Sequence, residues 1–278
     1  DDSAFMRQMF TKIIEQEPNL KVIETARNGS QALKLLDDIN PDVITLDVEM
    51  PVKNGIETLR EIISTKSIPV IMISAVDNKE TVMKALDIGA FDFIPKPSGS
   101  ISLDIESIQK RLITKIKAAI TSNKTNKTRS SYNKSFKSFN KNIKTSDKCP
   151  VIAIGSSSGG PKALKKVLTA FPKDFPAAFI IVQHMPAGFT ASLAKHLNQS
   201  CNIQVKEAEE KDPIKKGKAL IAPGDYHMEV NKNQTISLNQ EPQKWGVRPC
   251  VDYMMTSAAQ VYRKRLIGVI LTGMGHDG

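Results

Sequence analysis

Three segments in the second half of the sequence each place one reactive side chain directly after an apolar run. VIAI leads into GSSSGG with Ser157, AFIIVQ leads into His184, and LIGVILTG leads into MGHDG with Asp277. These residue types form a catalytic triad, in which the histidine removes the serine proton and the aspartate orients the histidine. Residues 155–159 also match G-x-S-x-G, the pattern of a nucleophile elbow between a strand and a helix. The pattern predicts acyl-transfer chemistry at Ser157.

Each of these residues also has a simpler explanation when it is taken alone. A Gly/Ser loop can bind phosphate or only form a turn, and the aspartate of GHDG can be a turn residue. The other histidines are less suitable bases, because His196 falls on a polar helix pattern, His227 follows a turn, and His276 adjoins Asp277. The combination at strand ends favours catalysis, although its order, Ser then His then Asp, differs from the Ser, Asp, His order of α/β-hydrolases.

A second set of reactive side chains lies in the first half of the chain. Asp1 and Asp2 begin it, Asp47 ends DVITLD, Ser74 ends IPVIMIS, and Lys96 follows AFDFIP. A single Asp after a strand is usually a turn former or a helix cap. Strand ends of a parallel sheet meet at one edge, however, and three carboxylates there repel one another unless a cation lies between them. Hard oxygen ligands suit Mg²⁺, so the set predicts a Mg²⁺ site.

Alternating helix and strand patterns must position both sets of residues. In the first half, helices are expected over 3–14, 29–39, 56–64, 79–89 and 104–120, and strands over 21–26, 42–47, 68–74 and 90–94. Near-continuous apolar strands alternating with helices are typical of a parallel sheet covered on both faces. Because such a sheet begins with a strand, we expect one ahead of residue 1. The second half has the same character, so the predicted fold class is α/β, with two doubly wound parallel-sheet domains.

Composition and charge narrow the function classes. The chain of 278 residues has 40% hydrophobic residues and a net charge of +10, and residues 121–148 hold seven Lys and one Arg against one Asp, which places +7 of that charge there. This polar segment lacks an apolar period and predicts a flexible linker between domains 1–120 and 149–278, although contact with anionic partners stays open. No apolar stretch is long enough for membrane insertion, and three scattered cysteines predict neither disulfides nor zinc. We expect a cytoplasmic protein.

The first domain resembles the receiver domain of two-component response regulators. The resemblance covers residues 1 to about 115 and rests on DD, LDVEMPVKNG, a lone Ser and KP. It implies that Asp47 accepts a phosphoryl group and that Mg²⁺ is bound by Asp2, with Asp1 beside it, by Asp47, and by the backbone carbonyl of Glu49.

The resemblance also assigns the residues that respond to phosphorylation. It implies that Ser74 is the switch hydroxyl, Lys96 the counter-ion of the phosphoryl group, and Phe93 the switch aromatic. The chemistry fits this assignment, since an aspartyl phosphate adds negative charge beside Mg²⁺ and Lys96, and a hydroxyl that moves toward it can re-order a loop.

With a receiver in front, the second domain resembles the chemotaxis-specific protein-glutamate methylesterases. The motifs are GSSSGG, QHMPAGFTASLA, RPCVDYM and GVILTGMGHDG, and the resemblance covers nearly every residue outside the linker. It implies a serine hydrolase that cleaves glutamate γ-methyl esters on chemoreceptors, often with deamidation of receptor glutamines. Ser157 is then the nucleophile, His184 the base and Asp277 the orienting acid, and the backbone N–H groups of Ser158 and Met274 bind the oxyanion. No metal is implied at this site.

Regulation and partners follow from the same resemblance. A chemotaxis histidine kinase would phosphorylate Asp47 and so loosen a receiver that covers the triad. The sequence departs from the common forms GASTGG and RPSVD at Ser156, Ser158 and Cys250, and the family continues beyond GMGHDG, so we expect further chain there.

Two other output functions fit the second domain less well. A DNA-binding output would require a helix-turn-helix with a basic recognition helix, whereas the second domain has Gly-rich strand ends and balanced charge, so we expect no nucleic-acid partner. A nucleotide-binding module would require GxGxxG or GK[ST], which GSSSGG lacks.

Overall fold

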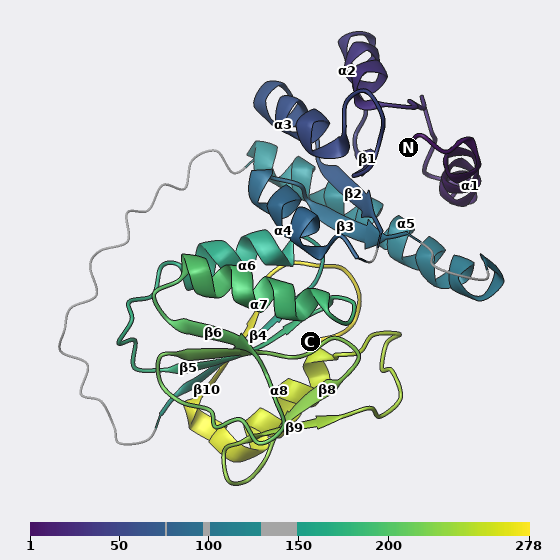
Figure 1. Ribbon diagram of the computed structural model, residues 1–278. Helices are drawn as coiled ribbons and strands as arrows, with labels where there is room; N and C mark the ends of the chain where they lie inside the picture. Colours follow the sequence, from purple (N-terminus) through teal and green to yellow (C-terminus); the bar gives the residue numbers. More distant parts are fainter. Residues whose placement is uncertain (76, 97–100, 129–148) are drawn as a thin grey trace. The chain divides into compact units, whose positions relative to one another are not determined.

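Two units of structure, Asp1–Arg129 and Ser130–Gly278, make up the chain in the computed structural model (Figure 1). The structure describes residues 1–75, 77–96, 101–128 and 149–278. Most of the predicted linker, residues 129–148, lies outside the described residues. Within the described ranges, no helix combines the length and apolar character needed to cross a membrane.

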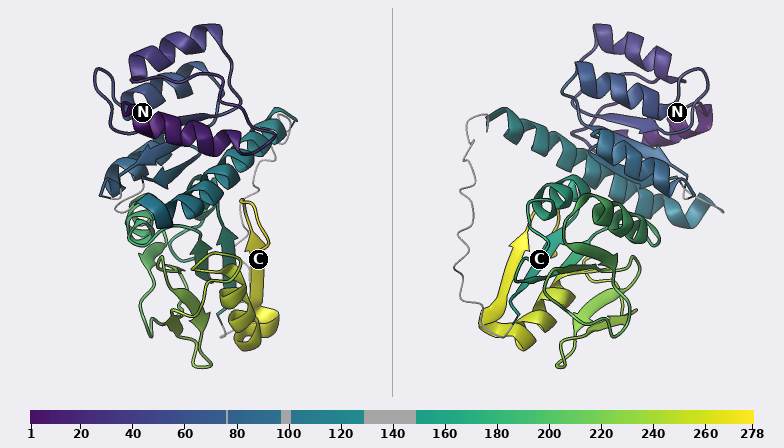
Figure 2. Two further views of the ribbon diagram at one scale, coloured as in Figure 1. Left: turned by 90° about the vertical axis from the view of Figure 1, so that its right-hand side faces the viewer. Right: turned by 60° about the vertical axis from the view of Figure 1, so that its left-hand side comes forward.

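The described part of the first unit contains a sheet of three parallel strands in the order β1, β2, β3. The strands are β1 (Ile44–Asp47), β2 (Val70–Ser74) and β3 (Asp92–Pro95). Helices α1 (Ala4–Glu15) and α5 (Ile101–Thr128) pack against each other on one side of this sheet (Figure 2). Ile71, Ile73 and Ile94 point from the strands into that core and meet Phe10 of α1 and Leu112 of α5. Alternate strand residues therefore face the two opposite layers.

The second layer consists of α2 (Gly29–Asp38), α3 (Gly55–Thr65) and α4 (Lys79–Ile88). A capping box starts α3, because the Asn54 side chain accepts from Glu57 N and the Glu57 carboxylate accepts from Asn54 N. A Cβ atom at Gly55 would lie 2.0 Å from the carbonyl oxygen of Asp47, so glycine is required where α3 passes the end of β1. These contacts fix the helix start beside Asp47.

Two expected elements of the first unit differ from the structure. Residues 21–26 form no strand, since no described segment pairs with them. Leu20–Ala26 instead line a cavity of about 490 Å³ together with Ile44 and Ile73 of the sheet. A run of strand-forming residues becomes a strand only when a neighbour completes its ladder of backbone hydrogen bonds. The helix expected over 104–120 runs over Ile101–Thr128, because the polar residues that follow 120 continue it without a Gly or Pro to stop it.

The second unit has a parallel sheet in the order β10, β4, β5, β7, β6. Its strands are β4 (Val151–Ser156), β5 (Ala178–Gln183), β6 (Gln204–Glu207), β7 (Lys218–Ile221) and β10 (Leu266–Ile270). Its helices are α6 (Gly160–Leu168), α7 (Phe189–Ser200), α8 (Val251–Tyr262) and the short 3₁₀ helix η1 (Arg263–Arg265). Helices α6 and α7 cover one face and α8 covers the other, so this sheet is doubly wound as predicted (Figures 1 and 2).

An antiparallel hairpin of β8 (His227–Val230) and β9 (Ile236–Asn239) packs against α8. Met228, Val230 and Ile236 of the hairpin join Met254 and Ala258 of α8 in one buried cluster with the inner residues of β4 and β5. This core holds the start of α8, near Cys250, close to the carboxyl ends of the central strands.

Candidate active site and phosphorylation site

Strand register brings Ser157 and His184 side by side. In the β4–β5 pair, Ser156 lies opposite Gln183, and the next residue on each strand is the candidate nucleophile or base. The backbone continues the pairing one step further, because His184 N donates to Ser156 O at 3.0 Å. Both residues therefore leave the same carboxyl edge of the sheet, as the sequence predicted.

A sharp turn after β4 presents Ser157. Gly159 adopts a left-handed conformation with φ 72°, which glycine tolerates, and α6 begins at the next residue. The segment after β10 closes over the turn, since Ser157 N donates to Thr272 O at 2.8 Å. A Cβ atom at Gly273 would lie 2.5 Å from Ser157 Cβ, so only glycine fits there. The strand-to-helix turn predicted from G-x-S-x-G is present in the backbone, with a positive φ at Gly159 and not at Ser157, and we call this turn the elbow.

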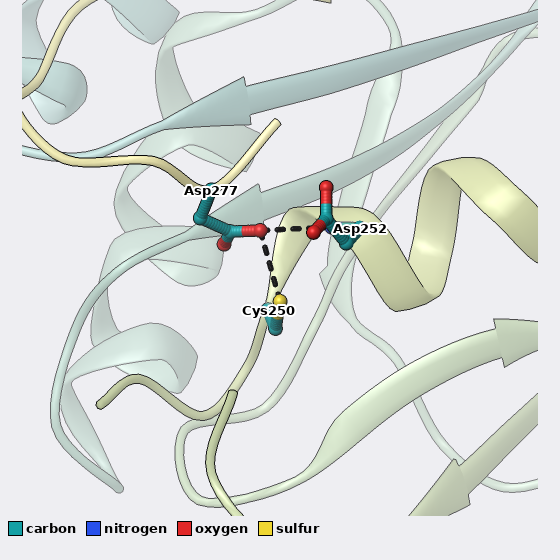
Figure 3. A group of neighbouring side chains, drawn as sticks. All are labelled: Cys250, Asp252 and Asp277. Atoms are coloured by element: carbon teal, nitrogen blue, oxygen red, sulfur yellow. Dashed lines mark hydrogen bonds between the residues drawn. The ribbon is translucent and has the colours of Figure 1, made fainter. Parts of the chain in front are cut away.

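Asp277 caps the N-terminus of α8. Its Oδ1 accepts from Cys250 Sγ at 2.9 Å and from Asp252 N at 2.9 Å. Figure 3 shows these two hydrogen bonds as dashed lines beside the start of the helix. Its Oδ2 accepts from Val251 N at 2.6 Å and meets His184 Nε2 at 2.8 Å. The carboxylate thus links the free N–H groups of a helix end to the candidate base.

The electrostatics of this cluster keep Asp277 ionised. Burial would raise its pKa, but hydrogen bonds from His184, Cys250 and the N–H groups of Val251 and Asp252 outweigh burial and lower the pKa to about 2. Burial, together with the bond to Asp277 and its negative charge, raises the pKa of Cys250 to about 12. Cys250, Asp252 and Asp277 are residue types that can bind a metal. In this structure, however, the Cys250 thiol and the N–H of Asp252 donate hydrogen bonds to the Asp277 carboxylate, which is the contact of a protonated thiol and not of a metal ligand.

The histidine can serve as a base through one particular ring nitrogen. Because Nε2 of His184 is bound to Asp277, Nδ1 is the ring nitrogen that stays available to accept a proton from Ser157. Within the described part of the chain, no direct hydrogen bond joins the Ser157 hydroxyl to the His184 ring. Such bonds are often long in free enzymes and shorten when substrate binds.

The backbone N–H groups of Ser158 and Met274, the predicted oxyanion donors, are among several near the elbow that donate to no other protein group within the described residues. Ser158 is 2% exposed and Met274 is 42% exposed. Free N–H groups beside a nucleophile can receive the negative oxygen of a tetrahedral intermediate.

In the first unit, Asp47 lies buried at the end of β1 next to a lysine. Lys96 Nζ is 2.7 Å from Asp47 Oδ2 and 3.7 Å from Asp1 Oδ2. The backbone N of Glu49 donates to Asp47 Oδ1 at 3.2 Å, and the Glu49 side chain turns away to accept from Asn78 Nδ2 at 2.5 Å. Sequence inspection missed Asn78, whose only signal is its place in the loop after β2.

The carboxylates of this site fit a hard divalent cation. Asp1, Asp2 and Asp47 each offer an oxygen within 4.8 Å of the others. Asp1 Oδ2 is buried and accepts no hydrogen bond within the described residues, and Lys96 Nζ at 3.7 Å is too distant to donate one, so this oxygen has capacity left for a metal ion. A carboxylate oxygen set of this kind matches the ligand preference of Mg²⁺.

The two predicted switch residues are Ser74, at the carboxyl end of β2, and Phe93, which is buried within β3. Ser74 is fully buried at the end of β2, where its hydroxyl donates to Ala75 O at 3.2 Å, and Lys96 N donates to Ser74 O at 2.7 Å. Phe93 is 2% exposed, and Lys115 Nζ lies 5.8 Å from its ring centroid.

Comparison with known proteins matches both units to families. The model of the response regulator receiver domain matches residues 1–106, and the model of the CheB methylesterase matches residues 152–278. A protein-glutamate methylesterase/protein-glutamine glutaminase of Pyrococcus horikoshii is 45% identical over 284 residues, which cover 100% of this chain and 77% of that protein. The protein of the same name from Halalkalibacterium halodurans is 47% identical over 298 residues, covering 100% and 81%. This chain belongs to that methylesterase family.

A solved structure, the Thermotoga maritima CheB methylesterase catalytic domain, is 42% identical and covers 47% of this chain and 71% of that chain, with a TM-score of 0.46. The two family models identify the two α/β domains expected from the sequence as a receiver domain and a methylesterase domain.

The remaining histidines of the methylesterase domain have other contacts. His196 Nε2 is 3.5 Å from Lys165 Nζ. His227 is fully buried, stacks on Tyr253 with ring centroids 4.1 Å apart, and has its pKa lowered chiefly by burial. His276 lies against Trp245. Of the four histidines, His184 follows the strand that pairs with β4 at the point where Ser157 leaves it, so His184 is the best-placed base.

Proposed function

We propose that this chain hydrolyses the γ-methyl esters of glutamate side chains on chemoreceptors, and that phosphorylation of Asp47 stimulates the reaction. The observation that carries the proposal is the arrangement around His184, which lies beside Ser157 in the sheet register and is 2.8 Å from Asp277. Methylesterase relatives at 45% and 47% identity support the substrate class.

The proposed reaction begins with proton transfer from Ser157 to Nδ1 of His184. The Ser157 oxygen attacks the ester carbonyl, while Asp277 stabilises the positive charge that develops on the ring. The protonated ring then gives its proton to the departing methoxide, and methanol leaves. Water, activated by the same ring, cleaves the acyl-enzyme and releases glutamate.

The oxyanion of each tetrahedral intermediate is received by the backbone N–H groups of Ser158 and Met274. This role is supported by the free donor capacity of the two amides. Donors that are already oriented stabilise the developing charge without reorganisation, which accounts for a large share of the rate in such sites.

In the receiver domain, Asp47 is the proposed phosphoryl acceptor, and a chemotaxis histidine kinase is the proposed donor. Mg²⁺ would be held by Asp1, Asp2 and Asp47 and by the carbonyl of Glu49, and when bound it neutralises carboxylate and phosphoryl oxygens. Lys96 pairs with the phosphoryl group, and the hydroxyl of Ser74 moves to it. Phe93 is the proposed aromatic partner of that movement.

The proposal includes a cytoplasmic location and an organisation into three parts. These are a receiver over 1–120, a basic polar tether over 121–148, of which residues 121–128 continue helix α5, and a catalytic domain over 149–278. The tether acts through reach and effective concentration, with no nucleic-acid partner.

The decisive experiment measures methanol released from membranes that carry methylated chemoreceptors. Release should require the intact chain and increase when acetyl phosphate and Mg²⁺ are added. The matched control is Ser157→Ala, which keeps the fold and removes the nucleophile. If the wild-type chain releases no methanol from a receptor that a known methylesterase demethylates, the proposed function is wrong.

Deamidation of receptor glutamines is the second activity proposed for the same site, because the names of the relatives include it. Ammonia instead of methanol would be the leaving group. Release of ammonia from receptors with unmodified glutamines, absent in Ser157→Ala, tests this activity separately.

A further inference from the structure

The side chain of Gln183, at the end of β5, lies directly beneath the nucleophile elbow and is 2% exposed. Its Nε2 donates to Ser157 O at 2.8 Å and to His184 O at 3.2 Å. Its Oε1 accepts from Ser156 Oγ at 2.7 Å. One buried amide therefore contacts the backbone of both the candidate nucleophile and the candidate base.

The hydrogen-bond partners determine which way this amide faces. The carbonyl oxygens of Ser157 and His184 can only accept, so the NH₂ group must point to them. The Ser156 hydroxyl can donate, and it lies on the other side, at the amide oxygen. Alanine at 156 would lack this donor, so Ser156 helps to hold Gln183 in one orientation.

The amide acts on the geometry of one peptide group. Ser157 O accepts from both Gln183 Nε2 and Gly160 N, each at 2.8 Å. In a planar trans peptide, the N–H of the next residue points opposite to the carbonyl. Because Gln183 holds the Ser157 carbonyl on its own side of this peptide, the N–H of Ser158 points to the opposite side. We expect the oxyanion to form on that opposite side.

The Gln183 amide fits closely between the elbow and the start of α6. A Cβ atom at Gly160 would lie 1.9 Å from Gln183 Oε1, so a larger residue at the start of α6 would displace the amide from this position. The amide is thus enclosed by the elbow, the helix start and the end of β5, and it has little freedom to choose other partners.

We propose that Gln183 is a positioning residue that aims the N–H of Ser158 at the oxyanion by fixing the Ser157–Ser158 peptide. The inference rests on the proposed esterase function and adds a residue that does not touch the substrate. Loss of one oxyanion donor costs about 10²- to 10³-fold in turnover, and that loss appears in kcat because the interaction forms only in the transition state.

The test replaces Gln183 in the full chain by Met, which has a similar volume and no donor. Ser156 can then turn its hydroxyl toward Val182 O, which is 3.5 Å away, so the main loss is the bond to the Ser157 and His184 carbonyls. We expect kcat of methanol release to fall about 10²-fold while KM for the methylated receptor stays within about twofold.

Two further variants separate positioning from general destabilisation. Thr190→Val removes another buried polar group, bonded to Glu207 and Gly224 N and not to the elbow, and should lower the melting temperature without the loss in kcat. Ser156→Ala leaves Gln183 in place but frees its oxygen, and should lower kcat by a smaller factor, about tenfold.

The outcomes distinguish this inference from the proposed function. A wild-type chain that releases no methanol contradicts the function itself. With an active wild type, a Gln183→Met chain that keeps kcat within about threefold, or that changes only KM, overturns the positioning role, as does an equal loss of kcat in Thr190→Val. If Gln183→Met does not fold, Ser156→Ala decides, and unchanged kcat in that variant overturns the proposal.

Discussion

Nε2 of His184 lies 2.8 Å from Oδ2 of Asp277, although the two residues are 93 positions apart in the chain. The aspartate is held for this contact by the start of α8, where two backbone N–H groups and one thiol donate to its oxygens. A helix end thus supplies the orientation and the charge environment of the candidate triad. The predictions below test this arrangement and the phosphorylation site.

Asp277 should make stability depend on pH in the acid range. Its pKa is lowered in the folded state from 3.8 to about 2, so its contribution is present above pH 4 and is lost as the pH falls toward 2. The difference amounts to about 2 kcal/mol of unfolding free energy. Urea unfolding followed by the fluorescence of Trp245, the single Trp of the chain, reports on the methylesterase domain.

The comparison variant for this measurement is Asp277→Asn, which cannot ionise. The stability difference between wild type and variant should shrink by about 1.5 kcal/mol from pH 6 to pH 2.5, and the rest should be lost below pH 2. Parallel pH curves for the two proteins would show that Asp277 does not carry the lowered pKa.

Cys250 should act as a hydrogen-bond donor to Asp277. Cys250→Ser keeps a donor at the same place and should retain methanol release within about threefold, whereas Cys250→Ala removes it and should reduce kcat by up to about tenfold. Steady-state kinetics of methanol release by the wild type and the two variants test whether kcat falls in this order. Equal activity of the Ala and Ser variants would show that the thiol contact has no functional role.

The three consecutive serines should differ by orders of magnitude. Ser157→Ala removes the nucleophile and should lower kcat about 10⁶-fold, whereas Ser158→Ala keeps its backbone N–H and should cost at most about 10²-fold. Methanol release normalised to folded protein measures both. An active Ser157→Ala chain together with an inactive Ser158→Ala chain would move the nucleophile to Ser158.

Asp47 should be the site of phosphorylation in the receiver domain. Asp47→Asn should abolish labelling by radioactive acetyl phosphate in the presence of Mg²⁺, because the acceptor carboxylate beside Lys96 is lost. Basal methanol release should stay near the unphosphorylated level, since the triad is unchanged. Labelling that persists in Asp47→Asn would assign the phosphoryl group to another carboxylate.

Local sequence patterns were sufficient to predict the α/β class and the strands that carry Ser157, His184 and Asp47. Continuous apolar runs mark buried parallel strands, and parallel strands deliver the residues that follow them to one edge. The same reasoning was wrong for residues 21–26, because a strand also needs a neighbour, and its pairing is not encoded in its own residues. It also ended the last receiver helix at residue 120, whereas α5 continues to Thr128. Polar composition alone does not stop a helix, and no Gly or Pro stands near residue 120 to do so.

The sequence by itself determined which side chains arrive at the functional edges, since residue type and position after a strand are properties of the chain. Only the tertiary structure decided how they are held. The ring nitrogen of His184 that faces Asp277, the thiol of Cys250 that donates to it, and the amide of Gln183 under the elbow all depend on contacts between distant segments. Hydrogen-bond direction and rotamer are set by the packing of α8, β5 and α6 around the site, and this packing is a property of the whole fold.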